Sequence, residues 1–217
     1  MFYLSPVARN LLIANVVIFF LLSFLKNQYI FDLFAFYNPI LPGSPDLINP
    51  NFKLWQPFSY MFLHGSFSHL LGNMLGLLFF APAIETFFGS KRFLIYYLVT
   101  GIGASFIYTL ANVYGMMQYL PETGEYLQLA MGSMVGASGA IFAILVAYAY
   151  LFPNNELIIF PLPIPIKAKY FVLLYGGYQI YGSLYDTGSN VAYFAHIGGL
   201  IIGFILLRFF GFGKPQY

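Results

Sequence analysis

The sequence predicts an all-α polytopic membrane protein, folded as one bundle of six transmembrane helices over residues 1–217. Of the 217 residues, 60% are hydrophobic and 7% are charged, whereas about 25% of the residues in a typical soluble domain are charged. A membrane-spanning helix takes roughly 20 apolar residues, so six spans and their connections use nearly the whole chain. We therefore expect no separate soluble domain.

Apolar runs bounded by Pro, Gly or charged residues define the expected spans. They lie near residues 8–25, 68–87, 93–113, 135–152, 170–184 and 191–210. The connection formed by residues 26–63 is long and aromatic and contains five prolines, which favours a structured outer loop over a flexible linker. Residues 183–190 are polar and contain a glycine, so we expect this short connection to move easily.

Positive charges predict the orientation, because both ends of a six-span chain lie on the same side of the membrane. Seven Lys and Arg residues fall on the side of the termini: Arg9, Lys91, Arg92, Lys167, Lys169, Arg208 and Lys214. Only Lys26 and Lys53 fall opposite, so we expect cytoplasmic termini. No organellar targeting segment is visible, which favours the bacterial cytoplasmic (inner) membrane. The net charge of +2 is too small and scattered to suggest a nucleic-acid partner.

With the ends of the apolar runs set aside, we single out four strongly polar side chains inside them, where such groups are costly and suggest function by default. His69 and Asn73 are in the second run, Ser138 is in the fourth and His196 is in the sixth. These three runs all cross from outside to inside, and each carries its polar residues within about two turns of its outer end. We therefore expect one shared site, slightly below the outer surface and open to it.

Small residues predict which helices meet at this site. One stripe of small residues begins at Gly139 in the fourth run, and another begins at Gly199 in the sixth, three residues after His196. Such stripes let two membrane helices approach closely. If the two stripes meet, His196 is brought toward Ser138.

The chemistry that this set permits is nucleophilic acyl transfer. The chain has no cysteine, so a covalent step must use oxygen or nitrogen. Ser138 is the candidate nucleophile and His196 is the candidate general base that takes its proton. His69, Asn73 and the backbone N–H of Ser138 are candidate donors to the oxyanion of a tetrahedral intermediate.

No carboxylate accompanies these residues at their depth, so the sequence predicts a dyad rather than a triad. Packing must then orient the imidazole of His196, and Phe142, one turn beyond Ser138, is placed to stack against it. We expect no metal and no cofactor. A single chain is sufficient to form the site, and the sequence leaves the oligomeric state open.

The same residues resemble the motifs of the rhomboid intramembrane proteases. Residues 136–139 (Gly-Ala-Ser-Gly) are similar to the nucleophile motif of that family, and residues 195–199 (Ala-His-Ile-Gly-Gly) are similar to the motif in its last span. His69 and Asn73 match its His-x-x-x-Asn element, and His64 matches the preceding histidine. The resemblance extends from about Trp55 to Gly203 and implies supporting roles for His64, Gly136, Gly139, Phe142 and Gly199.

The resemblance also implies a substrate class and a route to the site. The substrates would be transmembrane proteins cut near the outer face, with the fifth helix and residues 183–190 acting as a gate, and the lipid bilayer as the surroundings. One departure is Gln56, which follows the tryptophan of the first loop where many relatives have arginine. This change bears on the stability of the loop rather than on the chemistry.

Other interpretations remain open at this stage. A catalytically inactive relative that binds membrane clients would have the same fold. A transporter would need polar residues at several depths, which the sequence does not show. A zinc protease is disfavoured because no HExxH motif supplies a general base. Taken alone, Ser138 is typical of a structural serine bonded to its own helix, and His64 is typical of a loop histidine.

Overall fold

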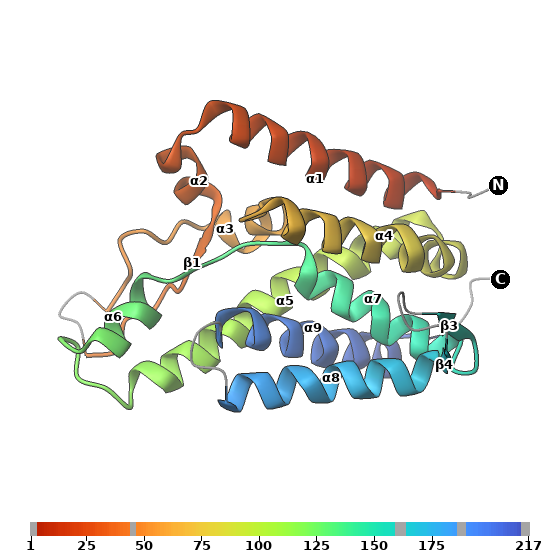
Figure 1. Ribbon diagram of the computed structural model, residues 1–217. Helices are drawn as coiled ribbons and strands as arrows, with labels where there is room; N and C mark the ends of the chain where they lie inside the picture. The colour runs from red at the N-terminus through yellow and green to blue at the C-terminus, as the bar shows by residue number, and fades with distance from the viewer. Residues whose placement is uncertain (1–3, 44–46, 159–163, 186–189, 214–217) are drawn as a thin grey trace.

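A computed structural model describes residues 4–43, 47–158, 164–185 and 190–213 of the chain (Figure 1). Helices make up most of it, with two pairs of short antiparallel strands. In chain order the elements are α1 (Pro6–Leu25), α2 (Gln28–Phe34), β1 (Phe36–Tyr37), α3 (Gln56–Ser59), the 3-10 helix η1 (Tyr60–Phe62), α4 (Phe67–Phe88), α5 (Ser90–Met116), α6 (Gly124–Met131), β2 (Ser133–Met134), α7 (Ser138–Leu151), β3 (Glu156–Ile158), β4 (Pro165–Lys167), α8 (Ala168–Tyr185) and α9 (Asn190–Phe209).

A helix lies over each of the six apolar runs: α1, α4, α5, α7, α8 and α9. Within the described ranges, α1, α4 and α5 are long and apolar enough to cross a membrane, and α7 and residues Tyr193–Phe209 of α9 are shorter apolar helices. Large apolar side chains face outward, such as Phe24 (84% exposed) and Leu173 (71% exposed). Such extensive apolar surface is expected where helices contact lipid rather than water.

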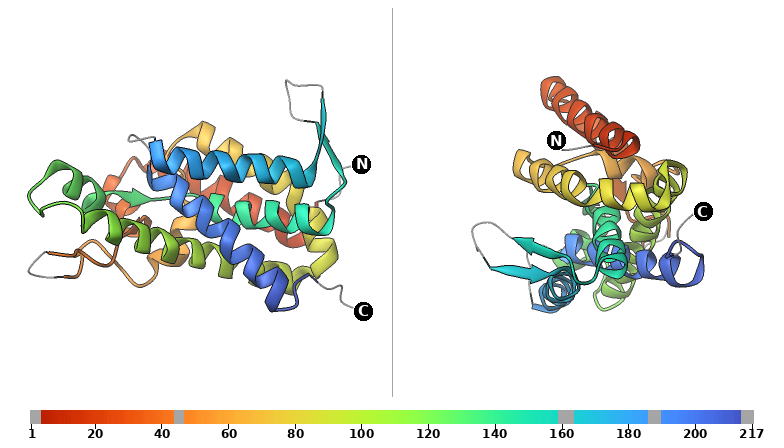
Figure 2. Two further views of the ribbon diagram at one scale, coloured as in Figure 1. Left: turned by 90° about the horizontal axis from the view of Figure 1, so that it is seen from below. Right: turned by 90° about the vertical axis from the view of Figure 1, so that its right-hand side faces the viewer.

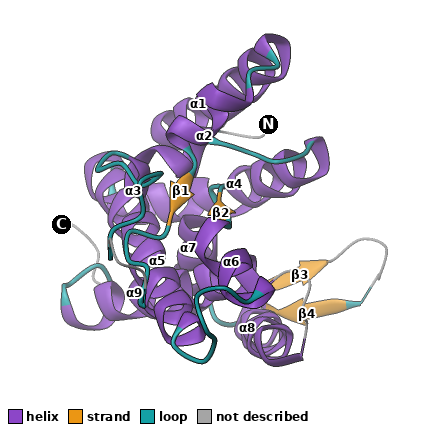
Figure 3. Ribbon diagram, turned by 90° about the vertical axis from the view of Figure 1, so that its left-hand side faces the viewer, coloured by secondary structure: helices purple, strands orange, loops and turns teal. Residues whose placement is uncertain are grey.

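The bundle has two distinct ends (Figure 2). Helices α2, α3 and α6 and the β1–β2 pair lie at one end, which we call the loop end and which faces the viewer in Figure 3. Strands β3 and β4 lie at the opposite end, which we call the hairpin end. Helix α9 packs against α5, α7 and α8, while α4 packs against α1, α5 and α7. Helix α7 therefore lies in the middle of the bundle, in contact with α4, α5, α8 and α9.

The first connection folds against the loop end, apart from residues 44–46, which lie outside the described ranges. Strand β1 pairs with β2 and so ties this loop to the segment just before α7. The side chain of Gln56 is fully buried. Its Oε1 accepts hydrogen bonds from the backbone N–H groups of Tyr37 (3.3 Å) and Lys53 (3.1 Å), and its Nε2 donates to the carbonyl of Asn51 (3.0 Å). One neutral amide thus joins the start of α3 to β1 and to residues 51–53.

Helix α7 begins later than the sequence predicts. The apolar run suggested a helix from residue 135, but residues 135–137 are not helical and α7 begins at Ser138. Gly136 has φ +121°, a conformation that glycine adopts easily and other residues rarely do. Its N–H donates to the carbonyl oxygen of Tyr60 (2.9 Å). Hydrophobicity alone does not reveal such a turn, and it also did not reveal α6 or the four short strands.

Helices α7 and α9 approach each other at glycines. A Cβ atom added to Gly199 would lie 1.9 Å from the carbonyl oxygen of Gly139, and one added to Gly203 would lie 2.7 Å from the Cβ of Ala143. Both distances are far shorter than van der Waals contact. The two small-residue stripes meet face to face, and the backbones pack closely because no side chain separates them.

At the hairpin end, the buried carboxylate of Glu85 joins the beginnings of α1 and α5 to α4. It accepts hydrogen bonds from the hydroxyls of Ser5 and Ser90 and from the backbone N–H groups of Val7 (3.0 Å) and Ala8 (2.8 Å). N–H groups in the first turn of a helix have no partner within their own helix. The carboxylate satisfies two of these groups and places a negative charge at the positive end of α1.

Replacing Gly199 with alanine tests the close approach of α7 and α9. The new methyl group would overlap the Gly139 carbonyl, so we expect Gly199→Ala to lower the free energy of unfolding by about 3 kcal/mol or more. Gly177→Ala is the matched control, because a Cβ atom there meets no atom within 4 Å and alanine favours helix by up to about 1 kcal/mol. Reversible unfolding in mixed detergent micelles measures both, and equal stabilities of the two variants would contradict the packing described.

Candidate active site

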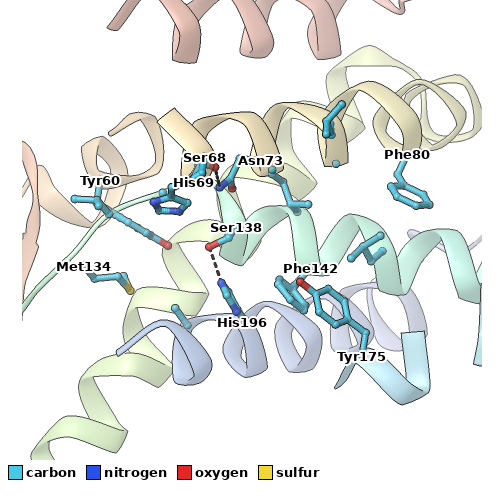
Figure 4. Close-up of a pocket in the computed structure, with 18 of the residues that line it drawn as sticks. Tyr60, Ser68, His69, Asn73, Phe80, Met134, Ser138, Phe142, Tyr175 and His196 are labelled. Carbon is cyan, nitrogen blue, oxygen red and sulfur yellow. Dashed lines mark hydrogen bonds between the residues drawn. The ribbon is translucent and has the colours of Figure 1, made fainter. Parts of the chain in front are cut away.

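A cavity of about 720 Å³ lies between α4, α7, α8 and α9 (Figure 4). Six of the residues singled out in the sequence line it: His69, Asn73, Gly136, Ser138, Phe142 and His196. The other three, His64, Gly139 and Gly199, are not part of its wall. The structure thus gathers side chains from helices that are far apart in the sequence around one space.

Ser138 and His196 form a hydrogen bond across this cavity. The Oγ of Ser138, at the first position of α7, lies 2.8 Å from the Nε2 of His196 on α9. Figure 4 shows Ser138 between His196 on one side and the side chains of His69 and Asn73 on the other. A hydroxyl at this distance from an imidazole nitrogen has the geometry that general-base activation requires.

The turn before α7 presents Ser138 to the cavity. Gly136 packs against the ring of His69, because a Cβ atom at this position would lie 2.7 Å from its Nε2. The positive φ of Gly136 turns the chain so that the helix starts two residues later, at Ser138. The backbone N–H of Ser138 is therefore in the first helical turn, where N–H groups have no partner within the helix. Such groups are suited to binding an oxyanion.

The ring of His196 is held on its face and at its second nitrogen. It stacks on Phe142, with ring centroids 4.2 Å apart and planes inclined by 16°. Phe142 in turn stacks on Tyr175 of α8, at 4.9 Å and 27°. The Nδ1 of His196 lies 2.8 Å from the Oε1 of Gln179, which also belongs to α8. Stacking fixes the plane of the imidazole, and the Gln179 bond fixes its rotation within that plane.

His69 and Asn73 complete the wall opposite His196. The N–H of His69 is capped by the hydroxyl of Ser66 (3.1 Å), which fixes the start of α4. The side-chain Nδ2 of Asn73 donates to the backbone carbonyl of His69 (2.8 Å). An asparagine amide has two N–H bonds, so the second remains available to a group in the cavity. Together with the N–H of Ser138, these side chains offer donors from two helices.

His64 lies behind this wall rather than in it. Its ring meets that of His69 edge to face, with centroids 5.1 Å apart, and the residue is buried at 4% exposure. Burial, and to a lesser extent the charge of His69, lowers the pKa of His64 to about 4. His64 is therefore neutral near pH 7, and its contact with His69 is one of ring packing.

Comparison with known proteins identifies the family. Residues 51–211 match the Rhomboid domain, which covers well over half of the chain and includes every residue of the cavity wall. The chain belongs to the rhomboid family. Members of this family are generally intramembrane serine proteases. The family and the apolar helices together make this rhomboid a multi-pass membrane protein.

Relatives of this rhomboid come from fungi, plants and bacteria. It is 31% identical over 142 residues to "Rhomboid protein 1, mitochondrial" of Saccharomyces cerevisiae, covering 65% of this chain and 38% of the yeast protein. It is 31% identical over 167 residues to "RHOMBOID-like protein 1" of Arabidopsis thaliana, covering 76% and 36%. It is 29% identical over 161 residues to "Rhomboid protease GluP" of Bacillus subtilis, covering 74% and 27%. The chain therefore spans less than half the length of each of these three relatives.

Two residues of the site were missed in the sequence. Gln179 is a strongly polar residue within the fifth apolar run, six positions from the end of α8, and applying the depth argument to that run finds it. Tyr60 lines the cavity and donates its hydroxyl hydrogen to the carbonyl of Gly101 (2.7 Å). No sequence signal distinguishes Tyr60 from the other 18 tyrosines of the chain.

The lowered pKa of His64 predicts how stability depends on pH. Between about pH 6.5 and pH 4 the unfolded chain protonates His64 while the folded chain does not, so stability falls as the pH is lowered through this window. We expect the wild type to lose roughly 2–3 kcal/mol more than His64→Phe between about pH 7.5 and pH 4.5. Phenylalanine keeps a ring against His69 but cannot titrate. Reversible unfolding at the two pH values measures the difference. Equal losses of stability in the wild type and in His64→Phe would contradict a pKa of His64 that burial lowers.

Proposed function

We propose that this rhomboid is an intramembrane serine endopeptidase that hydrolyses peptide bonds in or near the transmembrane segments of other proteins. The observation that carries the proposal is the 2.8 Å contact between Ser138 Oγ and His196 Nε2 at the wall of a cavity in the bundle. A structural serine in a membrane helix would instead bond back to its own helix. Ser105 of α5 does this, with its hydroxyl donating to the carbonyl of Ile102 (2.8 Å).

The proposed reaction proceeds by acyl transfer through a Ser138–His196 dyad. Nε2 of His196 takes the hydroxyl proton while Oγ of Ser138 attacks the scissile carbonyl carbon. The resulting oxyanion accepts hydrogen bonds from His69, Asn73 and the backbone N–H of Ser138, and one such donor is worth roughly 3–4 kcal/mol. His196 then gives its proton to the leaving amine. In the second half, a water molecule attacks the acyl-enzyme with the same histidine as base and regenerates Ser138.

The walls of the cavity suggest how a transmembrane substrate reaches Ser138. Phe79 and Phe80 of α4 and Phe171 and Tyr175 of α8 line it together with the dyad. An apolar segment can contact these aromatic rings while its scissile bond lies at the polar end. The proposal therefore places substrate entry between α4 and α8. Residues 186–189 of the expected gate, 183–190, lie outside the described ranges.

We also propose a membrane arrangement with six spans in a single domain. Helices α1, α4, α5, α7, α8 and α9 would cross the bilayer, with the loop end and the cavity opening outside and the hairpin end cytoplasmic. The charges support this orientation. The described basic residues expected on the side of the termini belong to elements that begin or end at the hairpin end: Arg9, Lys91, Arg92, Lys167, Lys169 and Arg208. A bacterial cytoplasmic membrane remains a prediction.

Alanine variants of the dyad test the proposed reaction. Ser138→Ala removes the nucleophile and His196→Ala removes the base, so we expect each to lower the rate of cleavage of a labelled single-span substrate in lipid vesicles at least about 10³-fold. Ser105→Ala is the matched control, because it removes a buried membrane serine that bonds to its own helix. Gel analysis of the cut product measures all three.

Two results would count against this proposal in different ways. Cleavage that survives Ser138→Ala rules out the serine mechanism. A wild-type chain that folds but cuts none of a broad panel of transmembrane substrates favours the alternative function, a catalytically inactive relative that binds membrane clients.

A further inference from the structure

Gln179 is a buried polar residue on α8, a helix with many exposed apolar side chains. Its side chain is 2% exposed, whereas its helix neighbours Tyr178 and Ile180 are 56% and 54% exposed. A polar side chain inside a membrane bundle is costly unless it is hydrogen-bonded. The partner of Gln179 is the Nδ1 of His196, 2.8 Å from its Oε1. Among the buried polar side chains of the described ranges, Gln179 is the one that contacts Nδ1 of His196. This is the ring nitrogen that faces away from Ser138.

The orientation of this amide determines which nitrogen of His196 carries hydrogen. A neutral imidazole has one N–H and one lone-pair nitrogen. In the structure Oε1 of Gln179 faces Nδ1, and because a carbonyl oxygen only accepts, this arrangement pairs with hydrogen on Nδ1. Nε2 is then left with its lone pair directed at the Ser138 hydroxyl. This is the tautomer that a general base requires.

We propose that Gln179 is a positioning residue that holds His196 in the Nδ1–H tautomer and in register with Ser138, an inference that rests on the proposed serine mechanism. Gln179 does not line the cavity and does not touch the nucleophile. It acts through His196, in the place where soluble serine proteases use a carboxylate. A neutral amide provides the acceptor without the cost of burying a further charge in the membrane.

Helix α8 then has two roles: it lines the substrate path, and it positions His196. Tyr175 and Gln179 are four residues apart and so lie on one face of α8; the first stacks on Phe142 and the second bonds to His196. Glycines let this face come close to α9, since a Cβ atom at Gly182 would lie 2.4 Å from the ring of Tyr193. Movement of α8 away from α9 at this level breaks the bond to His196. His196 therefore has the tautomer and orientation of a general base only while α8 stays in contact with α9.

Two substitutions separate positioning from simple packing. Gln179→Met has a similar length but no acceptor oxygen, so it fills the space and loses the hydrogen bond. Gln179→Glu keeps an acceptor oxygen in the same place, whether its carboxyl group is ionised or protonated. Thr109→Val is the matched control, because it removes a different buried polar group, a hydroxyl that donates to the carbonyl of Ser105 in its own helix.

The first measurement is the ¹⁵N spectrum of histidine-labelled protein, which distinguishes the two tautomers without any substrate. The chain has three histidines, and the His196 signals are identified by their loss in His196→Ala. We expect Nδ1–H and a lone pair on Nε2 in the wild type, in Gln179→Glu and in Thr109→Val. We expect Gln179→Met to shift the population toward Nε2–H. An unchanged tautomer in Gln179→Met would overturn the proposal.

The second measurement is the kinetics of substrate cleavage. Loss of one neutral hydrogen bond that orients the base should lower kcat about tenfold with little change in KM, and Gln179→Glu should recover most of this loss. Equal losses of kcat in Gln179→Met and Gln179→Glu would overturn the proposal, because they would mean that Gln179 only packs. A faster rate in Gln179→Met would also overturn it, because the bond to His196 would then restrain α8 and slow cleavage. A wild type that cleaves nothing overturns the proposed function, while the tautomer spectrum still decides whether Gln179 sets the proton on His196.

Discussion

The site of this rhomboid depends on the contact between Gly139 of α7 and Gly199 of α9. Any side chain on Gly199 would occupy the position of the Gly139 carbonyl, so the distance between the two backbones is set by the absence of side chains. In lipid there is little hydrophobic force to hold helices together, and close packing is a main source of helix association. Ser138 immediately precedes Gly139, and His196 lies one turn before Gly199. The same contact that joins the helices therefore sets the 2.8 Å distance between Ser138 Oγ and His196 Nε2.

The remaining parts of the site use neutral groups, which suits a membrane interior. His196 contacts a phenylalanine ring, a glutamine amide and a serine hydroxyl. None of these adds a charge that lipid would penalise. The carboxylate of Glu85 lies at the hairpin end, where four hydrogen-bond donors satisfy it. The charge of Glu85 thus has a structural role at the hairpin end, while stacking and neutral hydrogen bonds orient His196 inside the bundle.

The sequence was most informative where physical cost leaves a clear pattern. Apolar runs predicted that helices lie where α1, α4, α5, α7, α8 and α9 are found. The cost of polar groups in lipid singled out Ser138, His196, His69 and Asn73, all of which line one cavity. It was least informative where a single backbone angle decides the structure, as at Gly136, whose turn delays α7 by three residues. Gln179 does not share the pattern of these four residues, because it lies near the C-terminal end of its helix whereas they lie near the N-terminal ends of theirs. The partners of Gln56 depend on a loop whose fold follows from tertiary hydrogen bonds rather than from any periodicity.

Covalent labelling with a serine-reactive fluorophosphonate tests whether the contact between α7 and α9 activates Ser138. Peptide mass spectrometry of the labelled protein identifies the modified residue, and the chain has no cysteine that could compete. We expect a single adduct on Ser138 in the wild type, and a strongly lowered rate of labelling in His196→Ala. Labelling of a different serine, or labelling of Ser138 at an undiminished rate without His196, would contradict it.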